Sequence, residues 1–331
     1  MLIRLQDDAD PRAVERSLAA LGLWVRPLVD ADGVARALLV EPLSPPIEAA
    51  RVMAVPGVAG LLHARSPHPR VDAQAGRPVV FGPAVAGGDR PLLIAGPCSV
   101  DAEDTVHAIA AMAAAAGARA LRGGAFKPRT SPYSFDGHGH PALGWMRAAA
   151  DRNGLAMVTE VLSEHEVDAV AEVADLVQIG SRNMQNFALL RAVGATGRPT
   201  LLKRGMSATV EEWLLAGEHL LAAGASGVIF CERGLRSFDP GMRNLLDLAA
   251  VALLKHAHGQ PVVVDPSHAT GRRDLVLPLA LAARAAGADG VMVEAHVDPT
   301  RALSDGPQAI DGEALRALGR GLGLVAPEAQ R

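Results

Sequence analysis

Lysine and aromatic side chains are scarce in this chain of 331 residues, and cysteine occurs only twice. Only three of the 32 basic residues are lysines, Lys127, Lys203 and Lys255, so arginine is used almost everywhere that a cation is needed. Because the two side chains differ in geometry, hydration and pKa tuning, each remaining lysine is a candidate for a specific role. Lys255 falls in a predicted helix, and we expect it to be an ordinary surface residue.

Other absences exclude whole classes of protein. Two cysteines, Cys98 and Cys231, cannot form a disulfide framework in a chain this long, which favours a reducing cytoplasm. No apolar run reaches the roughly 18 residues of a membrane helix, and the N-terminal MLIRLQDDAD has no apolar signal-peptide core. A net charge of −4 gives no sign of a nucleic-acid-binding surface. With 49% hydrophobic residues, the composition is that of a globular protein with a large core.

The first 66 residues predict a small α/β domain. Their hydrophobic pattern indicates strands at 2–5, 23–29, 34–40 and 57–64, a helix over 10–21 and a second helix opened by Pro45 and Pro46. The order βαββαβ is typical of a ferredoxin-like fold. Residues 67–90 are rich in proline and glycine and are interpreted as a linker, with a short hairpin around 78–85.

Eight short apolar runs follow in the segment 91–325, each succeeded by a helix-like stretch. The runs are LLIAGPCS (92–99), ARALRGGAF (118–126), LAMVTEV (155–161), DLVQIGS (175–181), TLLKRG (200–205), GVIFCERG (227–234), VVVDPSH (262–268) and GVMVEAH (290–296). Continuous apolar runs are typical of strands buried on both faces, and their alternation with helices indicates a parallel sheet. Eight units in about 235 residues predict a (β/α)8 TIM barrel, and the alternative is a doubly wound open sheet.

Four potential metal ligands come from one side of this predicted barrel. Cys98 lies near the end of the first run and Glu294 near the end of the last, and these runs become neighbours when the barrel closes. His268 ends the seventh run, and Asp305 lies in the loop beyond Glu294. Taken singly, such residues are as often packing or capping residues. Together at the end where TIM barrels carry their active sites, they predict a divalent-ion site that fits Zn²⁺, Fe²⁺, Mn²⁺ or Co²⁺.

Cationic side chains lie in the last part of several other runs of the predicted barrel or just beyond them. They are Arg122, Lys127, Arg182, Lys203 and Arg233. A single strand-end arginine is usually just solvated, but five cations around one mouth repel one another unless anions lie between them. Arginine and lysine bind carboxylate and phosphate, so the set predicts a small, highly anionic substrate. Arg129 and Thr130, in the loop 121–139, indicate a second phosphate site.

These motifs resemble those of the 3-deoxy-D-arabino-heptulosonate 7-phosphate (DAHP) synthases, in the type I beta group with a ferredoxin-like N-terminal domain. The motifs are IAGPCS (94–99), LRGGAFKPRTSPYSF (121–135), QIGSRNMQNF (178–187), LLKRG (201–205), CERG (231–234), DPSHATGRRDL (265–275) and VEAH with ALSDGPQ (293–308). The resemblance is specific over about 91–325 and looser over 1–66. The related 3-deoxy-D-manno-octulosonate 8-phosphate synthases carry a Lys-Ala-Asn-Arg-type segment where this chain has Lys-Pro-Arg-Thr at 127–130.

The resemblance implies a metal-dependent, aldol-like condensation of phosphoenolpyruvate with D-erythrose 4-phosphate, the first step of the shikimate pathway to chorismate and the aromatic amino acids. It implies metal ligation, with Mn²⁺ favoured, by Cys98, His268, Glu294 and Asp305. It implies a phosphoenolpyruvate site made of Arg122, Lys127, Arg182, Lys203 and Arg233, with Glu160 nearby. Arg129 and Thr130 would hold the erythrose phosphate. Catalysis would then depend on Lys127, Lys203, His268 and Cys98.

For residues 1–66 the resemblance implies feedback inhibition, by tyrosine or phenylalanine, and a homotetramer. The alternative is an oligomerisation or lid domain that binds no effector. Three other functions fit parts of the pattern. They are a 3-deoxy-D-manno-octulosonate 8-phosphate synthase, a Schiff-base aldolase that uses Lys203 as its nucleophile, and a metabolite sensor without activity.

Overall fold

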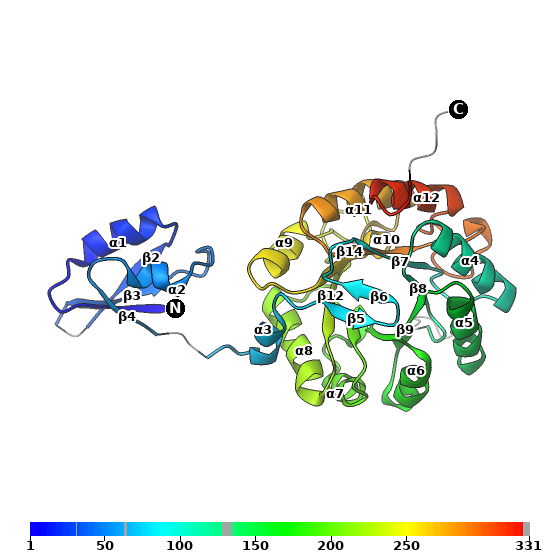
Figure 1. Ribbon diagram of the computed structural model, residues 1–331, viewed down its shortest axis with the longest axis horizontal. Helices are drawn as coiled ribbons and strands as arrows, with labels where there is room; N and C mark the ends of the chain where they lie inside the picture. Colours follow the sequence, from blue (N-terminus) through cyan, green and yellow to red (C-terminus); the bar gives the residue numbers. More distant parts are fainter. Residues whose placement is uncertain (31, 63–64, 128–132, 134, 327–331) are drawn as a thin grey trace. The chain divides into compact units, whose positions relative to one another are not determined.

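The computed structural model describes residues 1–30, 32–62, 65–127, 133 and 135–326. The chain divides into two compact units, Met1–Pro67 and His68–Arg331 (Figure 1). None of the described helices is long and apolar enough to cross a membrane.

The first unit is a four-stranded antiparallel sheet with two helices. Its elements are β1 (Leu2–Leu5), α1 (Pro11–Ala20), β2 (Val25–Val29), β3 (Ala35–Val40), α2 (Ala49–Met53) and β4 (Val58–Leu62). The element order βαββαβ is the predicted one, and the strands lie in the order β2-β3-β1-β4. Ile3, Leu18 and Leu38 are fully buried in its core. Helix α2 begins at Ala49 and not at Pro45. Pro45 precedes Pro46, and a residue that precedes a proline rarely adopts the helical conformation.

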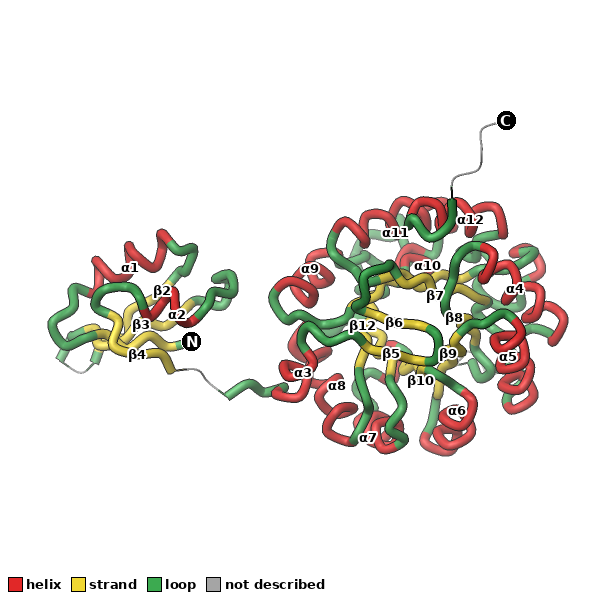
Figure 2. Tube along the Cα trace, in the orientation of Figure 1, coloured by secondary structure: helices red, strands yellow, loops and turns green. Residues whose placement is uncertain are grey.

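The second unit contains a closed barrel of eight parallel strands, which confirms the TIM barrel and excludes the open sheet (Figure 2). The strands are β7 (Leu92–Gly96), β8 (Ala120–Gly123), β9 (Ala156–Val161), β10 (Leu176–Ile179), β11 (Thr200–Lys203), β12 (Val228–Glu232), β13 (Val262–Val264) and β14 (Gly290–Glu294). Each strand falls within one of the predicted apolar runs. Strand β14 pairs with β7, so the first and last runs are neighbours, as the barrel prediction requires.

Helices surround the barrel and cover the outer faces of its strands (Figure 2). They are α4 (Glu103–Ala115), α5 (His140–Arg152), α6 (Val167–Val173), α7 (Phe187–Ala195), α8 (Val210–Ala223), α9 (Leu248–His256), α11 (Val276–Ala285) and α12 (Gly312–Gly321). The short α10 (Pro266–Thr270) instead follows β13 directly, at the C-terminal end of that strand. Helix α8 shows how local sequence sets the bounds. Thr209 and Glu212 form a capping box at its start, and Gly224 ends it with a φ of 118°. Its Trp213 is fully buried and donates from Nε1 to the carbonyl oxygen of Leu202 in β11, at 3.1 Å.

The segment 67–90 is more ordered than a linker. It holds helix α3 (Pro69–Gln74) and the antiparallel hairpin of β5 (Val79–Phe81) and β6 (Ala84–Ala86), near the predicted hairpin position. The buried hairpin residues Phe81 and Ala86 cluster with residues at the strand starts, such as Leu92 and Ala156. The hairpin therefore closes the N-terminal end of the barrel, and the Pro- and Gly-rich composition reflects its turns.

Lys255 is not the ordinary surface residue that its place in a helix predicts. Its Nζ lies 2.6 Å from Oδ1 of Asp289, whose side chain is almost fully buried. The other oxygen of Asp289 accepts a hydrogen bond from the backbone of Val262 at the start of β13. Lys255 thus stabilises a buried carboxylate that joins β13 to the segment before β14.

Candidate active site

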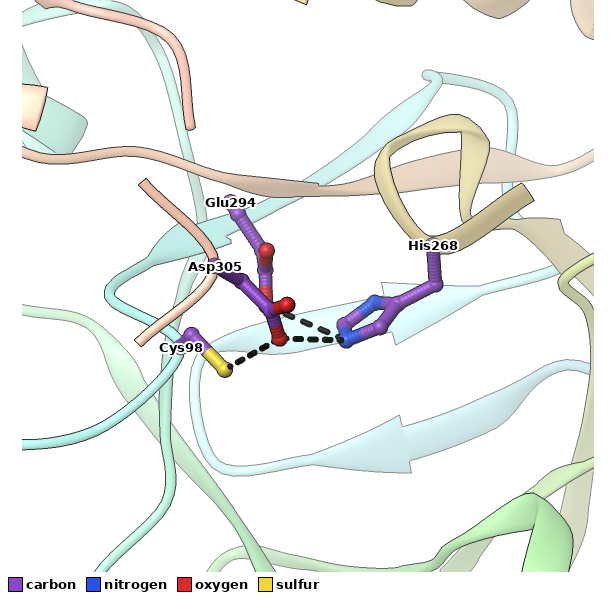
Figure 3. A group of neighbouring side chains, drawn as sticks. All are labelled: Cys98, His268, Glu294 and Asp305. Carbon is purple, nitrogen blue, oxygen red and sulfur yellow. Dashed lines mark hydrogen bonds and ion pairs between the residues drawn. The ribbon is translucent and has the colours of Figure 1, made fainter. Parts of the chain in front are cut away.

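The C-terminal ends of three neighbouring strands bring together the four predicted metal ligands (Figure 3). Cys98 follows β7, Glu294 is the last residue of β14, and His268 lies in α10, directly after β13. Asp305 belongs to the loop before α12. The strand order β13-β14-β7 places the first three side by side, at or within a few residues of a strand end, whereas Asp305 lies eleven residues beyond the end of β14.

The donor atoms of these four residues point toward one another. Cys98 Sγ lies 3.1 Å from Oδ2 of Asp305, and His268 Nε2 lies 3.1 Å from Oε1 of Glu294. His268 Nε2 is 3.9 Å from Oδ2 of Asp305. One donor atom from each residue lies within 4.8 Å of all the others. One sulfur, one nitrogen and two oxygens at this spacing fit a single divalent transition-metal ion.

Asp265 and Lys203 fix the orientation of His268. Asp265 accepts from the backbone nitrogen of His268 at 3.0 Å, and its Oδ2 lies 2.7 Å from His268 Nδ1. The same oxygen lies 2.6 Å from Nζ of Lys203. Although burial opposes ionisation, the charges of His268 and Lys203 lower the pKa of Asp265 well below its usual range. Nε2 of His268 is thereby left facing the other ligands, as in carboxylate–histidine–metal arrangements.

Arg122 and Gln308 hold Glu294 in a similar way. Arg122 donates from Nη1 to Oε1 of Glu294 at 2.9 Å, and Gln308 donates from Nε2 to Oε2 at 2.5 Å. Burial opposes ionisation of Glu294, but the charges of His268 and Arg122 lower its pKa below the usual value. Glu294 is therefore an oriented carboxylate, and Arg122 lies beneath the site as its support.

Lys127 lies against the thiol of Cys98. Its Nζ is 3.1 Å from Sγ and 2.9 Å from the carbonyl oxygen of the same residue. Burial and the charge of Glu294 raise the pKa of Cys98 to about 12. The thiol is protonated at neutral pH without a metal, so ligation by Cys98 requires that the metal displace this proton.

The loop that carries Asp305 is tethered to the segment after β7. Asp305 has a φ of 52°, and it is the one non-glycine residue with a positive φ within the described ranges. Asp101 accepts from Ser99 Oγ at 2.7 Å and from the backbone nitrogen of Leu303 at 3.0 Å. The hydroxyls of Ser99 and Ser304 are 2.6 Å apart. These contacts hold Asp305 in a strained conformation from which its carboxylate reaches Cys98.

We expect Asp101→Ala to weaken metal binding by about 10–100-fold, because the loop of Asp305 loses its tether. Saturating metal should restore most of the activity. Metal affinity is measured by isothermal titration calorimetry, with Asp298→Ala as the matched control. Asp298 lies in the same loop, but among the described hydrogen bonds its side chain accepts only from Thr300. Unchanged metal affinity in Asp101→Ala would contradict the tether.

A cationic cavity of about 130 Å³ opens beside the metal-ligand cluster. The charged and imidazole side chains that line it are Lys127, Arg182, Lys203, Arg233, Arg243, Glu160, Asp305 and His268. Burial lowers the pKa of Arg233, and a bound anion would offset that cost. A larger hollow of about 720 Å³ lies near the hairpin β5–β6 and contains none of the predicted site residues.

Glu160 and Gly180 form one wall of the cavity. Glu160 accepts from Nε2 of Gln178 at 3.1 Å, which turns its carboxylate across the end of β10. A Cβ atom on Gly180 would lie only 1.9 Å from Oε1 of Glu160. Glycine at this position therefore leaves room for the carboxylate.

Most of the predicted anion-binding residues meet at this cavity. Four of the five predicted cations line it, whereas the fifth, Arg122, supports Glu294 below. Arg129 and Thr130 lie outside the described residues. Arg243 is a lining residue that the sequence did not predict. Its Nη1 lies 3.3 Å from Oδ1 of Asp305 and donates to Gln308 at 3.1 Å. No strand-end signal marks Arg243, because it lies in the long loop between β12 and α9.

Comparisons with known proteins identify relatives of this chain. A sequence model of the DAHP synthetase I family matches residues 71–322. A phospho-2-dehydro-3-deoxyheptonate aldolase of Thermotoga maritima is 49% identical over 226 residues, which cover 68% of this chain and 67% of the relative. A 2-dehydro-3-deoxyphosphooctonate aldolase of Nitratidesulfovibrio vulgaris is 36% identical over 248 residues, covering 69% and 89%.

Two solved structures are similar to the fold. The crystal structure of a DAHP synthase from Thermotoga maritima gives a TM-score of 0.74 at 37% sequence identity and covers 96% of this chain and 95% of that one. A truncated form of 3-deoxy-D-arabino-heptulosonate 7-phosphate synthase from the same organism gives 0.69 at 42% identity, covering 74% and 90%. The chain belongs to the DAHP synthetase I family.

Proposed function

We propose that this chain is a metal-dependent DAHP synthase. It condenses phosphoenolpyruvate with D-erythrose 4-phosphate to give DAHP and inorganic phosphate, the first step of the shikimate pathway. One observation carries the proposal. A cluster of sulfur, nitrogen and oxygen donors adjoins a small cationic cavity at the mouth of a TIM barrel. A cytoplasmic location suits this reaction, because Cys98 must remain reduced to bind metal.

The proposed metal ligands are Cys98, His268, Glu294 and Asp305, with Mn²⁺ as the favoured ion. The mixed set of donor atoms supports this fit. So do the hydrogen bonds that orient the ligands, because Asp265 holds His268, and Arg122 and Gln308 hold Glu294. A divalent ion bound there supplies a Lewis acid for the aldehyde oxygen of the erythrose phosphate.

The cations of the cavity are proposed to bind and orient the two anionic substrates. Lys203, Arg182 and Arg233 would hold the phosphate and carboxylate of phosphoenolpyruvate at one end. Lys127, which contacts both the cavity and Cys98, would place that substrate beside the metal ligands. Arg129 and Thr130 remain the proposed residues for the erythrose phosphate.

In the proposed reaction, C3 of phosphoenolpyruvate attacks the aldehyde carbon and forms the new C–C bond. Water adds at C2 and gives up one proton, while the aldehyde oxygen takes up one proton and becomes a hydroxyl. The new C2 hydroxyl then loses its proton as the bond between C2 and the phosphate oxygen breaks, so that C2 becomes the ketone carbon and inorganic phosphate leaves with the proton. The fixed cations hold two anions that otherwise repel each other, and they stabilise negative charge as it develops. Glu160 also faces this cavity. Among the described lining residues, Glu160 and Asp305 are the two that carry a carboxylate.

The Schiff-base alternative is disfavoured by the surroundings of Lys203. A nucleophilic lysine must be a neutral amine. Lys203 Nζ instead lies 2.6 Å from the ionised carboxylate of Asp265, and both side chains are buried. Borohydride should therefore trap no covalent adduct with the substrates, and an adduct on Lys203 would revive this alternative.

The activity is tested by phosphate release from phosphoenolpyruvate with erythrose 4-phosphate as the acceptor, with and without divalent metal. We expect metal-dependent turnover. Arabinose 5-phosphate serves as the comparison acceptor, and its preferred use would instead identify a 3-deoxy-D-manno-octulosonate 8-phosphate synthase. Substrate binding without phosphate release from either acceptor would favour a sensor.

For the first unit we propose feedback regulation by tyrosine or phenylalanine in a homotetramer. The prediction is that the full chain loses at least half its activity with a saturating aromatic amino acid, whereas residues 67–331 keep theirs. Initial rates of both forms, with each amino acid, make the measurement, and light scattering gives the assembly state. Equal inhibition of the two forms would contradict a regulatory role for residues 1–66.

A further inference from the structure

A second group of metal-ligating side chains lies on the outside of the barrel, away from the cavity. It consists of His68 and Asp72 at the start of α3 and His258 just after α9. One donor atom from each residue lies within 4.8 Å of the other two. None of the three lines the cavity or contributes to the cluster around Cys98.

We propose that His68, Asp72 and His258 form a second divalent-metal site, suited to Zn²⁺. Two imidazoles and one carboxylate are a common zinc ligand set, which leaves a fourth position for water or another side chain. His68 Nδ1 and Asp72 Oδ1 are 2.9 Å apart. Two donors on one tetrahedral zinc ion lie roughly 3.4 Å apart, given bonds of about 2.1 Å, so a small adjustment admits the ion.

The charges around the cluster suit a dication. Glu211, in the first turn of α8, places Oε2 3.7 Å from Nε2 of His68. Asp72 and Glu211 together supply two negative charges beside two imidazoles. Glu211 can complete the coordination or accept the remaining N–H of His68, as carboxylates commonly do for metal-bound histidine.

Hydrogen bonds from one buried side chain connect the two backbone segments that carry these ligands. Gln260 donates from Nε2 both to the carbonyl oxygen of Val71 and to that of His258, each at 2.8 Å. It therefore links the helix of His68 and Asp72 directly to the loop of His258. His68 is 6% exposed, whereas Asp72 is exposed and His258 half-buried, which gives an ion a route of entry from solvent. Such preorganisation separates this cluster from chance contacts between surface side chains.

The test counts zinc bound to the full-length chain after chelator treatment, by equilibrium dialysis and metal analysis. Cys98→Ala is the background, because it removes the thiol ligand of the barrel-mouth cluster. We expect this variant to retain one tightly bound equivalent of Zn²⁺. Adding His258→Ala should weaken that binding at least 100-fold, and Asp72→Asn should do so to a smaller extent. His219→Ala is the matched control, since His219 lies on α8 and stacks on Phe187 outside the cluster.

A second measurement, of thermal unfolding with and without zinc, tests the site without an activity assay and without the double variants. Zinc should raise the thermal unfolding temperature of the chain with Cys98 intact more than that of His258→Ala, because an ion that binds only the folded state stabilises it. Two outcomes would overturn the proposal. In one, Cys98→Ala protein binds no tight equivalent of Zn²⁺. In the other, it binds one equivalent, and neither His258→Ala nor Asp72→Asn weakens that binding.

Discussion

Replacing Cys98 by alanine is expected to lower turnover by at least about 1,000-fold. A Lewis acid contributes several kcal/mol to the stabilisation of transition-state charge, and each 1.36 kcal/mol is a factor of ten in rate. The thiol is one of four donors, and Asp305 loses its contact with Sγ at the same time. The fold should survive, because Cys98 lies in the loop after β7, beyond the packed strands, and its truncation removes one sulfur atom.

The measurement combines steady-state rates, metal content and thermal unfolding. Cys231→Ala is the matched control, since this thiol is fully buried inside the barrel and takes no part in the ligand cluster. We expect the control to keep its metal and most of its activity, with a stability cost of about 1 kcal/mol for the small cavity. Full activity of the unmodified chain in metal-stripped buffer with chelator would contradict the metal requirement itself.

The barrel could be predicted from the sequence because its strands are buried on both faces. Every residue of β7 and of β14 is buried, so each strand is a continuous apolar run that local composition reveals. Position along the chain then determines position around the barrel. The closeness of Cys98, His268 and Glu294 follows from closure alone, without knowledge of any contact.

The supporting residues could not be predicted in the same way. Arg243 and Gln308 come from loops whose paths depend on tertiary contacts and not on a local period. Asp265 begins the motif DPSHATGRRDL (265–275), yet its contacts with His268 and Lys203 appear only in three dimensions. The same applies to Asp289, whose burial changes Lys255 from a surface charge into a structural cation.

Replacing Lys203 by arginine is expected to lower kcat by about 100-fold although the charge is kept. Nζ of Lys203 fits within 2.6 Å of Asp265 in a buried position, and a planar guanidinium needs more room and a different set of acceptors. Overpacking of this kind typically costs about 1–3 kcal/mol. A displaced Asp265 would also release His268, so metal affinity should fall by about 10–100-fold in the same variant.

Lys255→Arg provides the matched control for this substitution. Lys255 makes an ion pair of the same 2.6 Å length with Asp289, but its side chain is 31% exposed and lies on α9. Arginine can extend into solvent there, so kcat and metal affinity should stay within about twofold of the unmodified values. The contrast separates a general intolerance of arginine from a requirement for a compact charge at the cavity. Near-normal kcat and metal affinity in Lys203→Arg would show that any cation suffices beside Asp265, and the scarcity of lysine would then carry no functional meaning at position 203.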